Sequence, residues 1–250
     1  MPLGIGIGQV VGLLREVRAS EDSVATIAVA GPGASDFAAE LAAGGDARAV
    51  VVGGNALGAA VAVRLLDGDP SPEEASVLRS LARAGVPVVV VRTGSGSNLP
   101  HTLADDVIEV DGGHFAPDVA RAIARVAGSA APPLAARLPT LRSAVSSRLV
   151  NVTAWTSAAV AASATSLPQL PVLAFAQSRM LVLLGLARGD TLPREPQALA
   201  LAAGPSLAGA IAVGYVGRTI VRNSPVRGPI VRAVVAYAST RLLATARQRF

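Results

Sequence analysis

Cysteine and lysine are both missing from this 250-residue chain. Without cysteine there are no disulfides, thiolate metal sites or cysteine nucleophiles. All 22 basic residues are arginine, which excludes Schiff-base chemistry and the lysine of a phosphate-binding loop. Aromatic residues make up only 3%, so the hydrophobic 51% consists mainly of Ala, Val and Leu.

Acidic residues are scarce in the second half of the chain. Residues 1–129 hold 9 Arg and 15 Asp or Glu (9 − 15 = −6), whereas residues 130–250 hold 13 Arg and 2 acids (13 − 2 = +11). Such an asymmetry predicts two regions with different partners. We expect an N-terminal amphipathic segment over 1–22, an α/β domain over 23–129 and an Arg-rich apolar helical domain over 134–250.

The first half alternates short β-branched runs with helix-like segments. This pattern predicts an α/β fold, a Rossmann-like or G-domain-like mostly parallel sheet, followed by an all-α second domain. Strands are expected at Ser23–Ala30, Ala49–Val52, Ala60–Leu66, Val86–Arg92 and Val107–Val110, and helices at Asp36–Ala43, Pro72–Ala84 and Pro117–Ala127. Ser71 and Glu74 have the spacing of a capping box at one helix start.

The segment "AVAVRLLDGDPSPEEASVLRSLARAGVPVVVV" resembles the second half of the G domain of Era/Der-type bacterial GTPases. The resemblance covers roughly residues 24–128 and implies a P-loop-like framework. Its chemistry is missing: counted from Gly31, a GxxxxGK[ST] loop would place Gly, Lys and Ser/Thr where Asp36, Phe37 and Ala38 stand. The Asp-x-x-Gly and Asn-Lys-x-Asp motifs are absent too, so we expect a degenerate, pseudo-GTPase domain.

Ligands of open α/β sheets bind outside the carboxyl ends of the strands. The candidate ligand-binding residues at that edge are Gly31, Gly33, Ser35, Asp67, Asp69 and Thr93. Asp67 and Asp69 could bind a divalent ion or form a turn that leads into a capped helix, and the turn is favoured. His101 and His114 lack the spacing of metal ligands. We therefore predict no metal site, no catalytic residues and no cofactor.

In the second half, "SAAPP" over Ser129–Pro133 predicts a linker, and helical periodicity follows. We expect helices at Pro139–Val150, Thr153–Thr165, Leu170–Ala187, Pro196–Arg222 and Pro229–Arg247. In the last of these, a single apolar stripe is formed by Ile230, Val231, Val234, Val235, Ala238 and Leu242.

Two segments, "LPQLPVLAFAQSRMLVLLGLARG" and "VVAYASTRLLATA", resemble an uncharacterised helical domain that follows the G domain of some bacterial GTPases. The resemblance spans about residues 138–249, with Ala176 in place of an Asn before Gln177. It implies no catalytic residues.

Two uncharged stretches raise the question of a membrane, because about 20 apolar residues suffice to span one. They are the 30 residues between Arg148 and Arg179 and the 22 between Glu195 and Arg218. Prolines and polar residues interrupt the first and Gly204-Pro205 the second, so an internally packed bundle, peripheral attachment and a true span all remain open. Nucleic acid is disfavoured because the arginines are dispersed and aromatics for stacking are few.

We therefore predict a non-catalytic interaction or scaffold protein, cytoplasmic and at the inner face of the cytoplasmic membrane, whose partner is a protein or a membrane surface. One alternative is an integral inner-membrane protein with a cytosolic α/β head. Another is a sensor that binds a nucleotide or anion without hydrolysing it.

Overall fold

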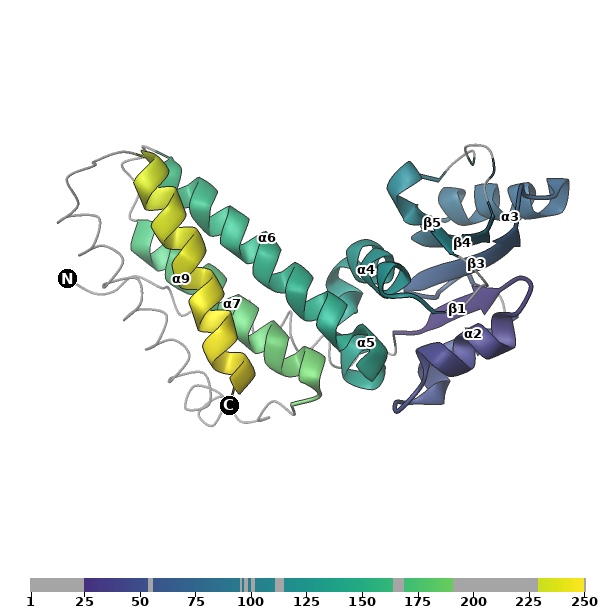
Figure 1. Ribbon diagram of the computed structural model, residues 1–250, viewed down its shortest axis with the longest axis horizontal. Helices are drawn as coiled ribbons and strands as arrows, with labels where there is room; N and C mark the ends of the chain where they lie inside the picture. The colour runs from purple at the N-terminus through teal and green to yellow at the C-terminus, as the bar shows by residue number, and fades with distance from the viewer. Residues whose placement is uncertain are drawn as a thin grey trace. The chain divides into compact units, whose positions relative to one another are not determined.

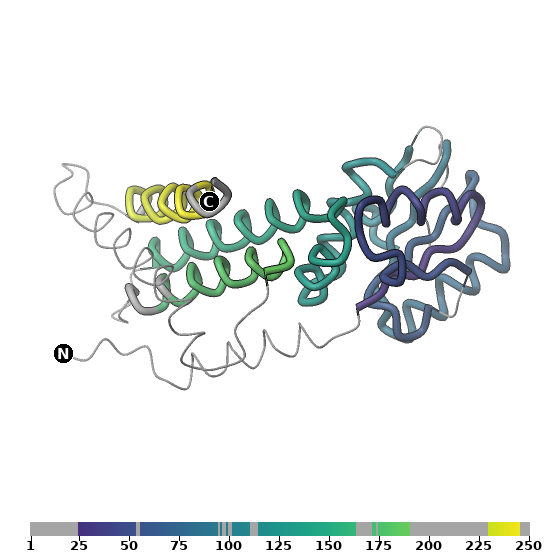
Figure 2. Tube along the Cα trace, turned by 90° about the horizontal axis from the view of Figure 1, so that it is seen from below, coloured from purple at the N-terminus to yellow at the C-terminus, as the bar shows by residue number. Residues whose placement is uncertain are grey.

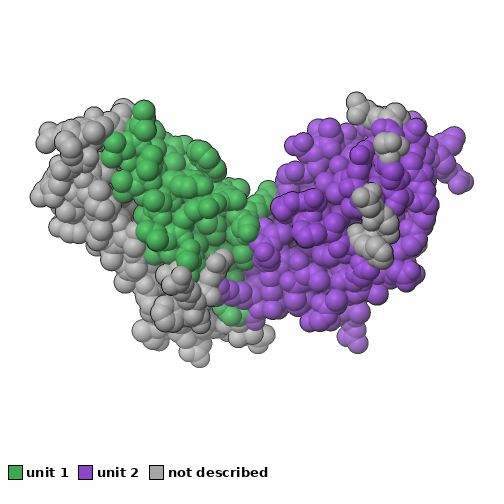
Figure 3. All heavy atoms as spheres, in the orientation of Figure 1, with its two compact units in different colours: residues 1–19, 146–186, 190–250 green, residues 20–145, 187–189 purple. Residues whose placement is uncertain are grey.

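The computed structural model describes residues 25–53, 56–94, 96, 99, 102–110, 115–163, 169–190 and 229–249. The chain divides into two compact units (Figure 3). Residues 20–145 with 187–189, purple in Figure 3, form the α/β unit, and residues 1–19, 146–186 and 190–250 form the helical unit. The N-terminal segment 1–22 and the helix expected at 196–222 lie outside the described residues.

The α/β unit is built on a five-stranded, all-parallel sheet in the order β2-β1-β3-β4-β5 (Figure 1). This confirms the predicted fold class. The order is one of the two common doubly wound arrangements, the one found in flavodoxin-like sheets. The strands are β1 Ile27–Ala30, β2 Val50–Val52, β3 Val61–Asp67, β4 Val88–Thr93 and β5 Val107–Val110.

Helices cover both faces of this sheet: α2 (Ala34–Leu41), α3 (Pro72–Arg83) and α4 (Pro117–Val126). Side chains alternate between the faces along a strand. Leu66 and Val90 pack with Leu78 of α3 on one face, whereas α2 lies against the face that carries Leu65 and Val91. Short 3-10 turns, η1 (Ala47–Ala49) and η2 (Ala104–Asp106), precede β2 and β5.

The start of α3 has the predicted capping box. The Glu74 amide donates to the Ser71 hydroxyl at 3.2 Å, and the Ser71 amide donates to the Glu74 carboxylate at 2.7 Å. The two side chains thus satisfy backbone donors that the first helical turn leaves without intrahelical partners.

The segment expected to be a linker, 129–133, is instead helical and largely buried. It forms part of η3 (Gly128–Ala130) and the start of α5 (Ala131–Arg137), and η4 (Pro139–Leu141) follows. Pro132 and Pro133 sit in the first turn of α5, where the missing N–H of proline would have no intrahelical partner anyway. This proline-rich segment therefore forms the start of a helix and not a linker.

Arg137, the last residue of α5, fastens this segment to the start of the sheet. Its guanidinium donates to Asp46 at 2.8 and 3.1 Å and to the Ala25 carbonyl at 2.8 Å. The Asp46 amide donates in turn to the Arg137 carbonyl at 2.9 Å. Nearby, a Cβ at Gly45 would lie 2.3 Å from the Arg137 carbonyl oxygen, so only glycine fits this close approach.

The helical unit contains α7 (Gln169–Arg188) to Leu186, α9 (Pro229–Arg249) and most of α6 (Arg142–Ala162), which run side by side (Figures 1 and 2). Residues 142–162 form a single helix, where we predicted two helices separated near 151–152. No Gly or Pro interrupts this stretch, so Asn151 and the β-branched residues beside it only lower helix propensity without ending the helix.

The interior of the helical unit mixes apolar, small and polar side chains. Val150, Met180, Leu181, Leu184 and Ala244 form an apolar cluster between the three helices. A second, polar contact joins α7 to α9: the Gln177 amide donates to the Thr240 hydroxyl at 3.1 Å, and both side chains are buried.

The apolar stripe predicted for α9 is largely exposed, and only its Val231 and Val235 are half-buried. Ile230, Val234 and Leu242 are 77%, 60% and 68% exposed, while Ala236, Thr240 and Ala244 are buried. The helix instead packs through small residues and a buried hydrogen bond, which allow a close approach between helices.

Candidate functional site

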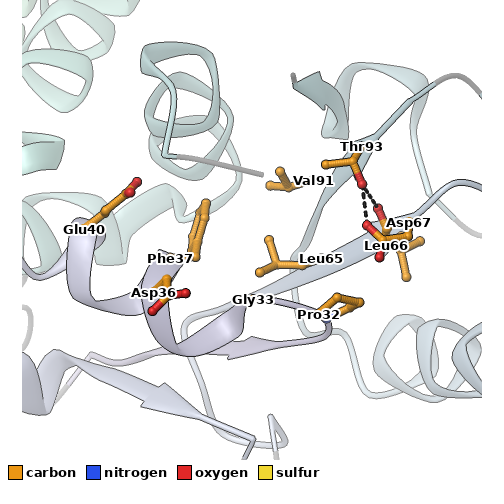
Figure 4. A pocket seen from close by; sticks show the side chains of 10 residues that line it. All are labelled: Pro32, Gly33, Asp36, Phe37, Glu40, Leu65, Leu66, Asp67, Val91 and Thr93. Carbon is orange, nitrogen blue, oxygen red and sulfur yellow. Dashed lines mark hydrogen bonds between the residues drawn. The ribbon is translucent and has the colours of Figure 1, made fainter. Parts of the chain in front are cut away.

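A cavity of about 250 Å³ lies at the carboxyl ends of the strands in the α/β unit (Figure 4). The strand order reverses between β1 and β3, because the chain passes from β1 to β2 on one side and to β3 on the other. Ligands of doubly wound sheets bind in the crevice at this switch point. The described residues that line the cavity are Pro32, Gly33, Asp36, Phe37, Glu40, Leu65, Leu66, Asp67, Val91 and Thr93.

The turn from β1 to α2 forms one rim of the cavity. It holds only three residues, 31–33 (34 − 30 − 1 = 3). Gly31 has φ 119°, and a Cβ there would lie 2.1 Å from the Leu65 carbonyl oxygen. Gly33 has φ 70° and caps the N-terminus of α2. Glycine therefore brings β1 and β3 into backbone contact and turns the chain into the helix.

The first two turns of α2 supply the adjacent wall, through Asp36, Phe37 and Glu40 (Figure 4). Phe37 is 1% exposed, and its ring meets that of Phe115 edge-on at 5.7 Å between centroids. The Glu40 carboxylate accepts a hydrogen bond of 2.8 Å from the Phe115 amide. Both side chains thus hold the chain before α4 against α2.

The opposite wall comes from the ends of β3 and β4. The Thr93 hydroxyl lies 2.5 Å from an Asp67 carboxylate oxygen and 3.2 Å from the Leu66 carbonyl oxygen. Its single proton goes to Asp67, because a hydrogen bond to a charged acceptor is shorter and stronger. Leu65 and Val91 supply apolar surface between the two walls.

The charge of this lining is negative. Three carboxylates, Asp36, Glu40 and Asp67, belong to it, and none of the described lining residues is basic. Two like charges 4 Å apart repel by roughly 1–4 kcal/mol at effective dielectric constants of 80 to 20. The cavity thus suits hydrogen-bond donors better than phosphate. Within the described ranges, no group of three or more His, Asp or Glu side chains could hold a metal ion.

Three of the six candidate residues named from the sequence meet in this cavity: Gly33, Asp67 and Thr93. Gly31 does not line the cavity but lies against the backbone of β3 beside it. Ser35 lies exposed in the first turn of α2. Asp69 lies elsewhere, next to the buried Arg92. A Cβ built on Gly96 would be 2.7 Å from the Asp69 carboxylate and 2.6 Å from the Arg92 guanidinium.

Arg92 occupies the other face of β4 from Thr93. It is 4% exposed and pairs with Glu109 of β5 at 2.5 Å. Asp69 is exposed, so it lies at the surface near this arginine, whereas Asp67 lines the cavity.

The lining residues that were not named as candidates from the sequence are Asp36, Phe37, Glu40, Leu65, Leu66 and Val91. For the three on α2, the available signal was the helical spacing of 33, 36–37 and 40, which puts one face of α2 toward the strand ends. His101 and His114, also considered from the sequence, lie outside the described residues.

Comparison of the chain with models of protein families, with curated proteins and with solved structures found no match in any of the three. The chain is therefore characterised by its fold alone, a five-stranded parallel α/β sheet followed by helices. None of the helices among the described residues is long and apolar enough to cross a membrane. The uncharged stretch between Glu195 and Arg218 falls outside them.

Proposed function

We propose that this protein is a non-catalytic interaction protein, in which a pseudo-GTPase-like α/β unit that does not turn over nucleotides is joined to a helical unit that binds a partner. Its partner is another protein or a membrane surface, and its location is the cytoplasm at the inner face of the cytoplasmic membrane.

The observation that carries the proposal is the three-residue turn between β1 and α2. In a phosphate-binding loop, the backbone N–H groups of a GxxxxGK[ST] segment surround the phosphates, and most of this segment precedes the helix. Here α2 begins at Ala34, and Phe37, at the position of the lysine, is buried in the core. The turn is therefore too short to surround a phosphate, and the position of the lysine is taken by a buried phenylalanine.

The carboxylates of the cavity count against the nucleotide or anion sensor. Asp36, Glu40 and Asp67 line the cavity, so a phosphate bound there would lie near like charge. A basic side chain or a bound cation would have to offset their charge. We therefore prefer the interaction protein over the sensor.

The test is a nucleotide assay on the full chain with two readouts. We expect no GTP or ATP hydrolysis above that of an Asp67→Ala variant, because Asp67 is a side chain of the cavity that can be removed without opening the core. We also expect no thermal stabilisation by Mg²⁺-nucleotides. A ligand present at 100 times its Kd stabilises a protein by about 2.7 kcal/mol, a shift that thermal unfolding detects. Hydrolysis that disappears in Asp67→Ala would refute the proposal.

A further inference from the structure

The outer face of α6 and α9 in the helical unit carries large apolar and aromatic side chains. Trp155, the only tryptophan of the chain, is 67% exposed on α6. Its ring meets that of Tyr237 on α9 edge-on, with 5.3 Å between centroids. Val152 is exposed one helical turn before Trp155, and Val234 is exposed one turn before Tyr237. We call this surface the α6/α9 face; its residues are Val152, Trp155, Ile230, Val234, Tyr237, Arg241 and Leu242.

Arg241 adds a fixed positive charge to the α6/α9 face. Its guanidinium lies over the Tyr237 ring, 5.4 Å from the centroid, and donates to the Asn151 amide oxygen of α6. The cation is thus held at the seam between the two helices, beside the two rings. Trp, Tyr and Arg together are the side chains that work best at a boundary between water and an apolar phase.

On the two helices that form this face, most of the buried side chains are small or polar, and the larger apolar side chains of the interior come mainly from α7. On α6, Ala154, Ser157 and Ala158 are buried together with Val150, while Val152 and Trp155 face outward. On α9 the same holds for Ala236, Thr240 and Ala244 against Ile230, Val234 and Leu242. Small and polar residues inside with large apolar ones outside are what helices show when their surroundings are apolar.

The charge of the same helices indicates which apolar partner this face would bind. The parts of α6, α7 and α9 that belong to the helical unit contain six Arg (one, one and four) and no Asp or Glu. A second copy of the unit would bring like charge against this face. An anionic bilayer surface offers both an apolar layer for the large side chains and negative headgroups for the arginines.

We propose that the α6/α9 face docks on an anionic lipid bilayer, with Trp155 and Tyr237 at the level of the headgroups and Ile230, Val234 and Leu242 in contact with the acyl chains. The proposal builds on the interaction function above by naming the partner as a lipid surface. The helices lie on the bilayer and do not cross it.

The single tryptophan makes the test direct in the unaltered full-length protein. Two kinds of vesicle are compared, neutral phosphatidylcholine and a mixture in which a third of the lipid is phosphatidylglycerol. With the mixed vesicles we expect co-sedimentation, a blue shift of Trp155 fluorescence and protection of Trp155 from acrylamide. Neutral vesicles bind more weakly, and salt reduces the difference because it screens the arginines.

Substitutions on the face separate its apolar and charged contributions. We expect Val234→Gln/Leu242→Gln to bind mixed vesicles at least about tenfold more weakly, since burial of one such side chain is worth that much. Arg241→Gln should weaken binding about fivefold on mixed vesicles and leave neutral vesicles unaffected. The matched control is Leu103→Gln, the same change at a 73% exposed leucine of the α/β unit, which leaves binding unchanged.

Three outcomes overturn the docking proposal. One is no co-sedimentation with mixed vesicles. Another is binding that the Val234→Gln/Leu242→Gln variant retains, since the arginines alone would then carry it. The third is a blue shift of Trp155 that appears without vesicles and grows with protein concentration, which would assign the face to a second copy. If vesicles fail and no nucleotide is hydrolysed, the interaction function stands and only its lipid partner is lost.

Discussion

Replacement of Gly31 by alanine tests the close contact between β1 and β3 that shapes the candidate cavity. Gly31 has φ 119°, a conformation that side-chain-bearing residues rarely adopt. The added Cβ would also lie 2.1 Å from the carbonyl oxygen of Leu65, a backbone atom of β3. Neither strand can shift independently, because all four residues of β1 pair with residues 61–64 of β3.

The expected loss follows from two contributions. A residue held in a sparsely populated backbone region costs about 1–3 kcal/mol. Overpacking against atoms that cannot move costs about a further 1–3 kcal/mol. The free energy of unfolding of Gly31→Ala should therefore fall by about 2–6 kcal/mol, a large share of the roughly 5–15 kcal/mol of a typical domain.

Gly68→Ala is the matched control. Gly68 follows β3 at the same sheet edge and has φ 76°, but a Cβ there would meet nothing within 4 Å. Its substitution costs about 1–2 kcal/mol for the left-handed backbone alone. Both changes affect the unfolded chain equally, so the difference between the variants reports the contact with Leu65 together with the extra backbone strain at φ 119°.

The measurement is urea unfolding followed by far-UV circular dichroism, with hydrogen exchange of β1 and β3 peptides as a local readout. We expect faster exchange in both strands of Gly31→Ala. If Gly31→Ala loses no more stability than Gly68→Ala, the backbone contact between β1 and β3 is not as close as described, and the account of the turn fails.

Two further predictions concern the same unit. Phe37→Ala should lower the free energy of unfolding by about 3–5 kcal/mol in urea titrations, because it empties a buried aromatic site next to Phe115; a loss below about 1 kcal/mol would show that the ring is not part of the core. Asp46→Asn should lower Tm at neutral pH but not in strong acid. Hydrogen bonds from the Arg137 side chain, and then from the Arg48 amide, hold the pKa of Asp46 below its usual 3.8. The lowered pKa adds stability above pH 3.8, and this stability disappears as the pH falls through the pKa of the folded protein. An equal Tm difference at both ends of a pH series would contradict this.

The strands and helices of the α/β unit could be predicted because each carries a local signal. Continuous apolar runs marked all five strands, and the Ser71–Glu74 pair marked the start of α3. The strand order could not be predicted, since it depends on pairings such as Ala28 with both Val51 and Ala62 that no local pattern encodes. For the same reason the site could be predicted only in part. Gly33, Asp67 and Thr93 could each be named from the sequence, but that they line one cavity depends on the tertiary structure.

Two patterns in this sequence are each compatible with two structures, and one of them led to a wrong prediction. Pro132 and Pro133 are as compatible with a linker as with the first turn of a helix, and the helix forms here because its residues are buried. In α9 the apolar periodicity was real, but it marked the outer face because Ala236, Thr240 and Ala244 permit closer packing. Hydrophobic periodicity predicts that a helix has two faces, and the neighbours decide which one is buried.

The bonds of Arg137 have a consequence for the synthesis of the chain. The start of the sheet, at Ala25 and Asp46, is tied to a residue 91 to 112 positions later. At roughly 5–20 residues per second, Ala25 leaves the ribosome about 5–20 s before Arg137 is made. Through this interval the Ala25 carbonyl lacks the partner that it has in the folded chain. A fragment cut after residue 129 would lack that partner permanently, together with the buried Leu134, Leu138 and Leu141.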